Sequence, residues 1–430
     1  MQKQRMIKKS ITYFIGSFST RLLTVCLVFL YAFYIDASDL GKYEYIQALV
    51  NIIVPIFYFS IWEAILKFVL SEKDEENKRK IITTSALFSI AISIIILFVF
   101  GIYYTFASKL QINTIYILLT YIVNGITWVW QNYAKTLQRN KTYVKSSIIG
   151  SVVHLITIIF LIIFANIKLD ALFIANILGI FTTFFIIEKD LHVIKNIKKT
   201  DFDISILKKM IKYAFPLVIT VIPVWVITGF GKIIIQNVLG SNANGIYSFA
   251  HKFTVIITFI GNILNMAITE EMFIIGKEDM DKDFSKIFQN LIEKFLSLTI
   301  IAIPFLIVFY KIISKTEYYM SKEYVPLLLL YALAMIMINN ISTVFKVHEK
   351  AKEQSIATII GASIAIIIMT GTINILGIMG VVLGQLCGIL INLLLMLIFM
   401  KKYSKIKINY RKIIILMIIY SLVSTLMYKL

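Results

Sequence analysis

The sequence predicts an all-α protein that crosses a membrane many times. Its 430 residues are 59% hydrophobic and only 16% charged, and the mean hydropathy is +0.84. A soluble domain could not bury that much apolar surface, whereas a polytopic membrane protein exposes it to lipid. The apolar residues also form runs of about 20 or more, as membrane-spanning helices require.

Length and hydropathy place twelve such runs along the chain. They lie at about residues 11–34, 44–70, 81–107, 112–135, 146–166, 168–188, 211–239, 245–272, 289–312, 323–345, 355–374 and 377–400. A thirteenth run, at about 412–428, is shorter and follows a basic segment. It could span the membrane or lie in the interface as an amphipathic brace.

The long polar segment in the middle of the chain divides the runs into two sets of six. We therefore predict a six-helix lobe at 1–188, a cytoplasmic linker at 189–210, a second six-helix lobe at 211–400, and a basic linker with an extra helix at 401–430. Gly41 and Tyr43 match Gly245 and Tyr247 at a shift of 204 residues. An even helix number keeps both lobes in the same orientation, which predicts a parallel pseudo-two-fold and a central cavity.

The net charge of +19 indicates orientation in the membrane rather than a nucleic-acid partner. Lys and Arg gather before the first run and in every second connecting segment, which the positive-inside rule places in the cytoplasm. We expect a multi-pass protein of the cell membrane with a cytoplasmic N-terminus. The two cysteines lie inside apolar runs, and the sequence has neither a metal-binding nor a nucleotide-binding motif, so we expect no cofactor.

One stretch, residues 213–272, carries a recognisable order of residues. These are Tyr213, Pro216, Leu217, Lys232, Leu239, Gly240, Gly245, Tyr247, Ser248, Ala250 and Lys252. The order resembles the seventh and eighth helices of the polysaccharide flippases of the multidrug/oligosaccharidyl-lipid/polysaccharide exporter superfamily. In that family an acidic residue often precedes the basic one, whereas this chain has Gly231 there. Because Pro216 and Pro223 fall in the first of the two runs, we expect that helix to be bent or broken.

The resemblance implies a flippase that moves a polyprenyl-pyrophosphate-linked oligosaccharide to the outer leaflet for capsule, O-antigen or related surface glycans. Its partners would be that substrate, membrane lipids, and the glycosyltransferases and polymerase of the same pathway. A cation-coupled multidrug antiporter and a peptidoglycan-precursor flippase are alternatives with the same fold. A glycan polymerase or ligase is less expected, because all predicted external segments are short.

Arg21 is the most informative charged residue, since it lies about ten residues, or about 15 Å, into the first run. A charge at that depth costs about 2.5–3.5 kcal/mol or more, so it should face a wet cavity or pair with an acid such as Glu63. The family resemblance implies the cavity. Lys232 and Lys252 lie near the turn between the seventh and eighth runs, where they could line the cavity or extend to the interface.

Glu63 and Lys67 lie four positions apart, so they could form an ion pair on one helix or contact substrate. His251 could relay protons, although a single helical histidine more often packs with a hydrogen-bond partner. We predict that Arg21, Lys67, Lys232 and Lys252 bind the pyrophosphate. Glu63 and His251 are candidates for coupling or cavity lining, and no residue is expected to be catalytic. Trp128 and Trp225, with Trp130, could stack on sugars or fill helix interfaces.

Overall fold

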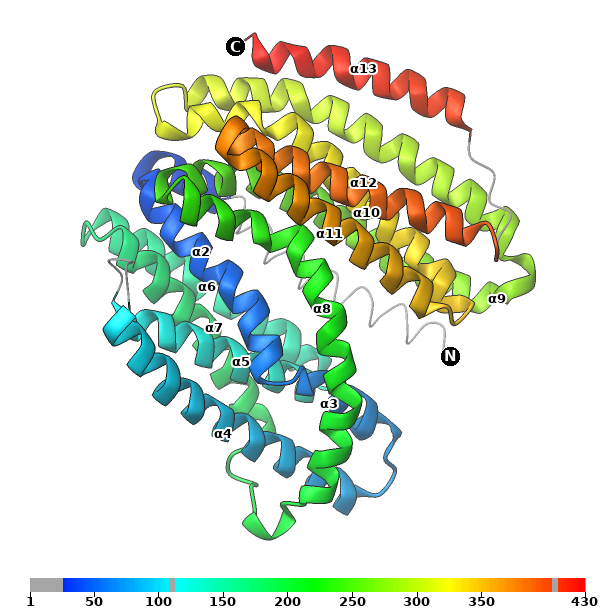
Figure 1. Ribbon diagram of the computed structural model, residues 1–430. Coiled ribbons are helices and arrows are strands. Elements are labelled where there is room, and N and C mark those ends of the chain that lie inside the picture. The colour runs from blue at the N-terminus through cyan, green and yellow to red at the C-terminus, as the bar shows by residue number, and fades with distance from the viewer. Residues whose placement is uncertain (1–25, 108–112, 404–408, 430) are drawn as a thin grey trace. The chain divides into compact units, whose positions relative to one another are not determined.

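The computed structural model describes residues 26–107, 113–403 and 409–429 (Figure 1). Apart from two short 3-10 helices, every regular element in these ranges is an α-helix. Nine of the described helices are long and apolar enough to cross a membrane, or up to ten if the bent pair α2 and α3 is one span. The chain is therefore a polytopic all-α membrane protein, which confirms the predicted fold class.

The described chain divides into two compact units. Unit 1 holds residues 26–30 and Ile46–Ile222, and unit 2 holds Tyr31–Tyr45 and the chain from Pro223 onward. The units differ from the predicted lobes, because a segment of the first half packs with the second half. The predicted pseudo-two-fold and central cavity stay predictions.

Unit 1 is built mainly from five helices that follow α2. The elements are α2 (Ala37–Phe57, from Ile46 onward), α3 (Ile61–Ser71), α4 (Glu75–Ala107), α5 (Thr114–Thr136), α6 (Asn140–Ile163), α7 (Leu169–Leu191), η1 (Lys199–Asp201) and α8 (Ile204–Val238, up to Ile222). Helix α5 packs against α3, α4 and α7, and therefore lies at the centre of the unit.

The predicted run 44–70 is two helices rather than one. Phe59 and Ser60 have left-handed backbone angles, with φ of 52° and 46°, and α2 and α3 meet at 52°. Tyr58 fixes the break, because its fully buried ring lies against Gly125 and its hydroxyl is 2.7 Å from the Ser93 Oγ. Sequence hydropathy could not show this break, since the residues around it are as apolar as the helices themselves.

The predicted linker 189–210 is attached to unit 1. Arg79 Nε lies 2.8 Å from Asp201 Oδ2, and the backbone N–H of Asp203 donates to the Thr84 Oγ1 at 3.1 Å. Helix α8 begins at Ile204 and continues without a break through Pro216 and Pro223. The seventh helix was predicted to be bent or broken, and the structure excludes a break.

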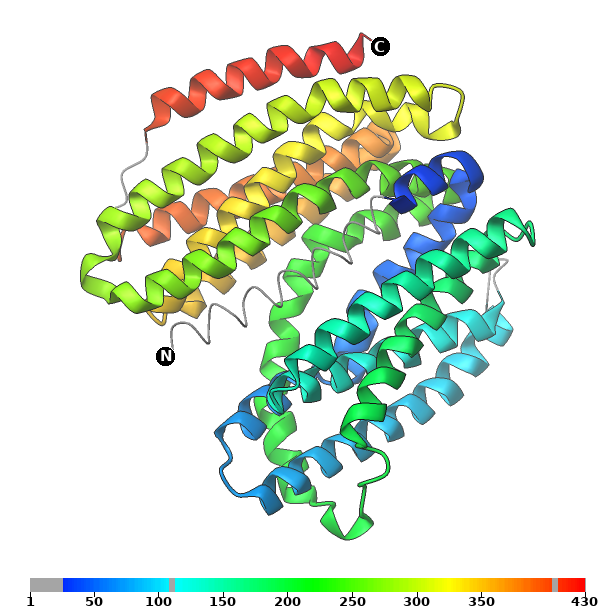
Figure 2. The same cartoon turned by 180° about the vertical axis from the view of Figure 1, so that it is seen from behind.

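Unit 2 holds α9 (Ser241–Ile312), η2 (Glu317–Glu323), α10 (Val325–Val347), α11 (Ala351–Leu376), α12 (Ile378–Met400) and α13 (Tyr410–Tyr428). Helix α9 has 72 residues, which would extend about 108 Å if it were straight. It doubles back instead, as Figures 1 and 2 show. The rings of Phe249 and Phe309 lie 6.3 Å apart as a result. Its two arms therefore correspond to the predicted eighth and ninth runs.

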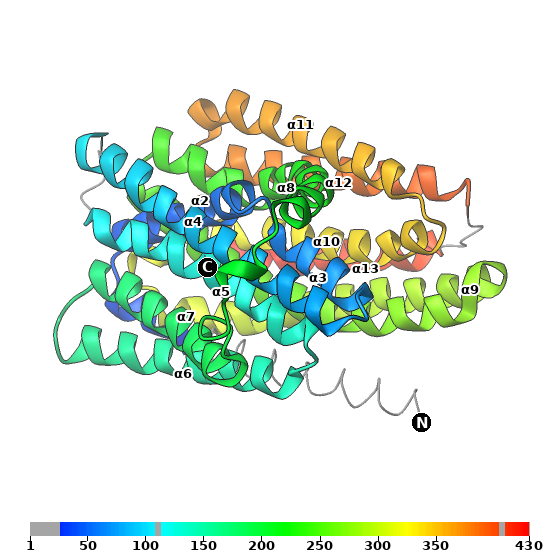
Figure 3. The same cartoon turned by 90° about the horizontal axis from the view of Figure 1, so that it is seen from below.

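Each unit contains one hairpin whose helices cross at a pair of glycines, and both hairpins can be followed in Figure 3. In unit 1, a methyl group on Gly150 of α6 would meet the carbonyl oxygen of Gly179 on α7. In unit 2, a methyl group on Gly361 of α11 would meet the carbonyl oxygen of Gly388 on α12. Small residues let membrane helices approach closely. The two units therefore share a local packing motif.

Helix α13 follows the second arm of α9 along its length. Lys412 Nζ lies 3.7 Å from Glu293 Oε2 near one end of α13, and the Tyr428 hydroxyl donates to the Glu323 carbonyl at 3.3 Å near the other. Between them, the buried Tyr420 hydroxyl donates to the Pro326 carbonyl at 2.6 Å. These contacts place α13 beside the second arm of α9. Both helices are long and apolar enough to span a membrane.

Candidate functional site

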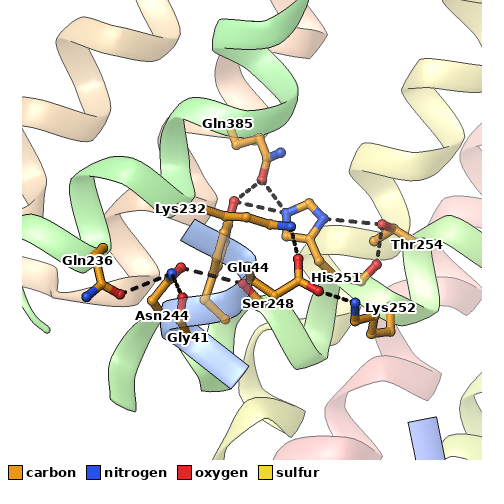
Figure 4. A network of polar contacts seen from close by, with 11 residues as sticks. Gly41, Glu44, Lys232, Gln236, Asn244, Ser248, His251, Lys252, Thr254 and Gln385 are labelled. Atoms are coloured by element: carbon orange, nitrogen blue, oxygen red, sulfur yellow. Dashed lines mark hydrogen bonds and ion pairs between the residues drawn. The ribbon is translucent and has the colours of Figure 1, made fainter. Parts of the chain in front are cut away.

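Unit 2 contains a buried carboxylate that contacts two lysines. Glu44 lies on α2, Lys232 on α8 and Lys252 on the first arm of α9 (Figure 4). Lys232 Nζ is 2.5 Å from Glu44 Oε2, and Lys252 Nζ contacts Glu44 Oε1. We call these three residues the charge triad. They come from three separate helices and form one local site.

A close helix crossing brings α2 to α9. A methyl group on Gly41 would overlap the carbonyl oxygen of Ser241, and one on Gly245 would overlap the carbonyl oxygen of Ala37. The two contacts are reciprocal, because a shift of 204 residues turns Gly41 into Gly245 and Ala37 into Ser241. The side chain of Asn244 donates to the Gly41 carbonyl at 2.7 Å. Only glycine permits this approach, which places Glu44, one turn further along α2, opposite the two lysines.

A network of neutral polar side chains adjoins the charge triad (Figure 4). Gln385 Oε1 on α12 accepts hydrogen bonds from the Tyr247 hydroxyl and from His251 Nε2, each at 2.9 Å. Gln385 Nε2 donates to the Ile227 carbonyl at 2.9 Å. His251 Nδ1 lies 3.3 Å from Thr254 Oγ1. All these side chains are buried and hydrogen-bonded, so no unpaired polar group lowers the stability. The network therefore holds α12 and α8 against α9.

The charge triad carries one net positive charge. The Glu44 side chain is only 6% exposed, whereas those of Lys232 and Lys252 are 19% and 17% exposed. An ammonium group has three N–H donors, and Glu44 uses one on each lysine. The remaining donors can bind an anion, and the partial exposure of the lysines lets an anion reach them. The ring of Tyr31 lies 5.5 Å from Lys252 Nζ and gives that cation a further contact.

The structure brings together three of the six predicted site residues. Lys232 and Lys252 share Glu44, and His251 lies in the adjoining network. Sequence reasoning missed Glu44, because it lies at the edge of the predicted run 44–70 and resembled a boundary residue. Two intramembrane lysines with no acid within four positions along their own helices were the available signal, since buried charges are normally paired.

The other predicted residues lie elsewhere. Lys67 and Glu63 are exposed residues of α3 in unit 1, and among the described residues no ion pair joins them. Lys67 Nζ lies instead 3.9 Å from the centre of the Tyr213 ring. Arg21 lies outside the described residues, so its role stays a prediction.

Within the described ranges, no group of three or more His, Cys, Asp or Glu side chains is arranged to hold a metal ion.

Comparison with solved structures finds the same fold in several membrane transporters. The lipid II flippase MurJ in an inward closed conformation matches with a TM-score of 0.64 and 17% identity, covering 98% of both chains. An inward-facing multidrug resistance MATE family transporter of the MOP superfamily gives a TM-score of 0.66 at 12% identity, covering 89% of this chain and 97% of the other. A MOP superfamily transporter from Pyrococcus furiosus gives 0.62 at 12% identity, covering 92% and 96%.

No curated protein sequence matches this chain. The family described as "Polysaccharide biosynthesis protein" matches residues 6–273, which include the charge triad and all of the stretch that carries the recognisable residue order. That match covers more than half of the chain and confirms the resemblance found in the sequence. The chain therefore belongs to the polysaccharide biosynthesis protein family, and its fold is that of the MOP superfamily transporters.

Proposed function

We propose that this protein is a flippase that moves a polyprenyl-pyrophosphate-linked oligosaccharide from the cytoplasmic to the outer leaflet of the cell membrane, for surface polysaccharide synthesis. Family membership supports the polysaccharide pathway, and the fold supports membrane transport. Transport would proceed by alternating access, in which the headgroup site opens first to the cytoplasmic side and then to the outer side of the membrane. The pathway's glycosyltransferases and polymerase are its proposed partners.

The charge triad is the observation that carries this proposal. A pyrophosphate group is a compact anion that needs cationic hydrogen-bond donors once it leaves water. Lys232 and Lys252 offer such donors on neighbouring helices, and Glu44 limits the local charge to one positive unit. A site of this kind can bind an anion without holding it permanently. Arg21 and Lys67 are proposed as further contacts along the path.

The multidrug antiporter is less well supported by the same site. Binding of sodium, protons or cationic drugs requires a carboxylate that is open to a cation. Glu44, the buried acid of the site, is instead occupied by two ammonium groups. For the Pyrococcus furiosus transporter, the reverse polarity of the binding pocket is said to suggest a different function. Charge sign is therefore a reasonable criterion for function within this fold.

A peptidoglycan-precursor flippase is a second candidate, since a structure of the lipid II flippase MurJ matches 98% of both chains. Its headgroup also contains a pyrophosphate, so the charge triad does not distinguish the two substrates. The family match to polysaccharide biosynthesis favours the oligosaccharide.

The test is transbilayer movement of fluorescent lipid-linked substrates in proteoliposomes. We expect the wild type to move a polyprenyl-pyrophosphate oligosaccharide, and Lys252→Met to reduce the initial rate at least tenfold. Lys315→Met is the matched control, because Lys315 is an exposed lysine between α9 and η2. It should leave the rate unchanged. Lys252→Arg keeps the charge and should retain part of the activity.

Faster movement of lipid II than of any oligosaccharide lipid would favour the peptidoglycan-precursor function. No movement of either lipid, together with proton- or sodium-driven efflux of a cationic dye, would overturn the proposal in favour of an antiporter.

A further inference from the structure

Unit 1 contains a second group of aromatic and charged side chains, separate from the charge triad. We call it the aromatic–lysine patch. It consists of Trp62, Glu63 and Lys67 on α3, Trp128 and Lys135 on α5, and Tyr213 on α8. All six residues belong to unit 1.

The two tryptophans form an edge-to-face pair with exposed ring surface. Their ring centres lie 5.3 Å apart and their planes make an angle of 88°. Both rings are half-buried, whereas Trp130, two positions further along α5, is fully buried and donates to Glu188 Oε2 at 2.7 Å. Trp130 therefore has a structural partner that accounts for it, while Trp62 and Trp128 keep surface available for a ligand.

The charged members keep free hydrogen-bonding capacity. Lys67 Nζ lies over the Tyr213 ring at 3.9 Å, and Lys135 Nζ lies 4.9 Å from the centre of the Tyr143 ring. Glu63 attracts Lys135 electrostatically, but among the described residues no close ion pair holds its carboxylate. Cation–π contacts position an ammonium group without using its N–H donors on another polar atom.

The charged residues on this face of α3 favour contact with water over contact with lipid. Helix α3 ends at Ser71, so Glu63 lies about 12 Å inside it. An exposed carboxylate at that depth is tolerated only beside water or polar groups. The opposite face, with Ile61, Ala64, Ile65 and Val69, forms the buried contact with unit 1. A lipid-facing aromatic belt would not place an acid between its tryptophans and a lysine.

We propose that the aromatic–lysine patch binds the sugar rings of the lipid-linked substrate, an inference that rests on the proposed flippase function. A pyranose ring has an apolar C–H face that packs on an indole and a rim of hydroxyl groups. Trp62 and Trp128 match the face, because their rings are large, rigid and partly exposed. Glu63 accepts hydrogen bonds from hydroxyl groups, and Lys67 and Lys135 donate to them.

The position of the patch agrees with a loading role. The segments 71–80 and 135–145, next to the ends of α3 and α5, are rich in Lys and Arg and are predicted to be cytoplasmic. The substrate is assembled on that side, so its glycan reaches this end of unit 1 first.

The experiment compares the affinities of the full-length protein in nanodiscs for two probes. One probe is polyprenyl pyrophosphate without sugar, and the other is the same lipid with an attached oligosaccharide. The ratio of the two dissociation constants measures what the glycan contributes. We expect the wild type to bind the glycosylated lipid at least tenfold more tightly. Trp62→Leu and Trp128→Leu should bring the ratio close to one while leaving the affinity for the sugar-free lipid unchanged.

Trp225→Leu is the matched control, because Trp225 is a half-buried tryptophan of α8 in unit 2, and it should keep the wild-type ratio. Glu63→Gln changes an exposed side chain by one atom at nearly constant size, and should lower the ratio several-fold even if a tryptophan variant does not fold. Lys252→Met should weaken both lipids equally and leave the ratio intact.

An unchanged ratio in Glu63→Gln and in the folded tryptophan variants, or a wild-type ratio of one, would overturn this inference alone. A wild type that binds neither lipid would overturn the proposed function and this inference together. The two failures are therefore distinguishable.

Discussion

Lys232 Nζ lies 2.5 Å from Glu44 Oε2, although 188 positions separate the two residues in the chain. The contact gives one of the two intramembrane lysines of unit 2 a counter-ion, and Lys252 shares the same carboxylate. Any anion that binds these lysines must therefore share them with Glu44. The carboxylate acts as an internal competitor that keeps the site from holding an anion too tightly.

Replacing Glu44 by Gln should tighten anion binding and slow turnover. The substitution keeps the side-chain size but removes the competing charge, so the local charge rises from one to two positive units. We expect about tenfold tighter binding of polyprenyl pyrophosphate, equivalent to about 1.4 kcal/mol, and a lower transport rate because release becomes slower. Binding is measured in nanodiscs and transport in proteoliposomes.

The control for this variant is Glu323→Gln, which changes an exposed acid at the end of η2. It should alter neither quantity. Weaker binding of the sugar-free lipid by Glu44→Gln would show that the carboxylate helps to bind substrate and does not compete with it.

Glu44 and Lys252 should be energetically coupled. Lys252→Met leaves a buried carboxylate with one partner instead of two, which we expect to cost about 1–3 kcal/mol of stability. In the Glu44→Gln background the same change should cost much less, because Lys252 then has no carboxylate partner to lose and its removal relieves the repulsion with Lys232. Thermal unfolding in detergent of both single variants and the double variant measures the coupling. Strictly additive shifts in Tm would mean that the contact contributes nothing to stability.

The glycine crossing of α2 and α9 should tolerate no side chain. In Gly41→Ala the new methyl group would overlap the Ser241 carbonyl oxygen, so the helices must separate and the charge triad must loosen. We expect a loss of about 1–3 kcal/mol in stability, as for other overpacked sites, and reduced transport. Both effects are measurable on the purified protein, by thermal unfolding and by proteoliposome assay.

Gly371→Ala provides the comparison, because a methyl group there meets no atom within 4 Å. Helix propensity alone predicts that this change in α11 is neutral or stabilises by up to about 1 kcal/mol. Equal stability of the two alanine variants would argue against a close crossing at Gly41.

The sequence predicted the fold class well because hydropathy reports lipid exposure directly, and each of the twelve described α-helices overlaps a predicted run. It singled out Lys232 and Lys252, which the structure brings together at Glu44, because a cation in an apolar run is visible locally. It did not predict Glu44 as their partner, since that contact depends on a helix crossing between distant segments. The break after α2 was also invisible, because it depends on how Tyr58 packs against Gly125.

The match between the two halves of the chain was a weak signal that pointed to a real contact. The two matches at a shift of 204 were weak as a sequence signal, yet one of them, the pair Gly41 and Gly245, forms the reciprocal crossing seen in unit 2. A repeat maintained by backbone approach requires only that glycine be kept, so the rest of the sequence is free to diverge.

Helix α13 should span the membrane, which the sequence left open. It has 19 residues and is therefore about 28 Å long, close to the thickness of the hydrocarbon layer. Near its first residue, Lys412 contacts Glu293 at the start of the second arm of α9. Near its last residue, Tyr428 contacts Glu323 at the end of η2, which follows that arm. An interfacial brace could not follow a spanning helix in this way.

Cysteine labelling in intact cells tests this topology. In a background in which the free Cys26 and Cys387 are replaced by serine, Lys402→Cys and Lys429→Cys place one thiol before α13 and one after it. We expect an impermeant maleimide added outside to label position 429 and to label position 402 only after the membrane is opened. Labelling of both positions from one side would place α13 in the interface. The hydrogen bond from the buried Tyr420 hydroxyl to the Pro326 carbonyl would then have to form at the membrane surface. Water is available there as a hydrogen-bond partner, so burial of this hydroxyl against a carbonyl would have no physical explanation.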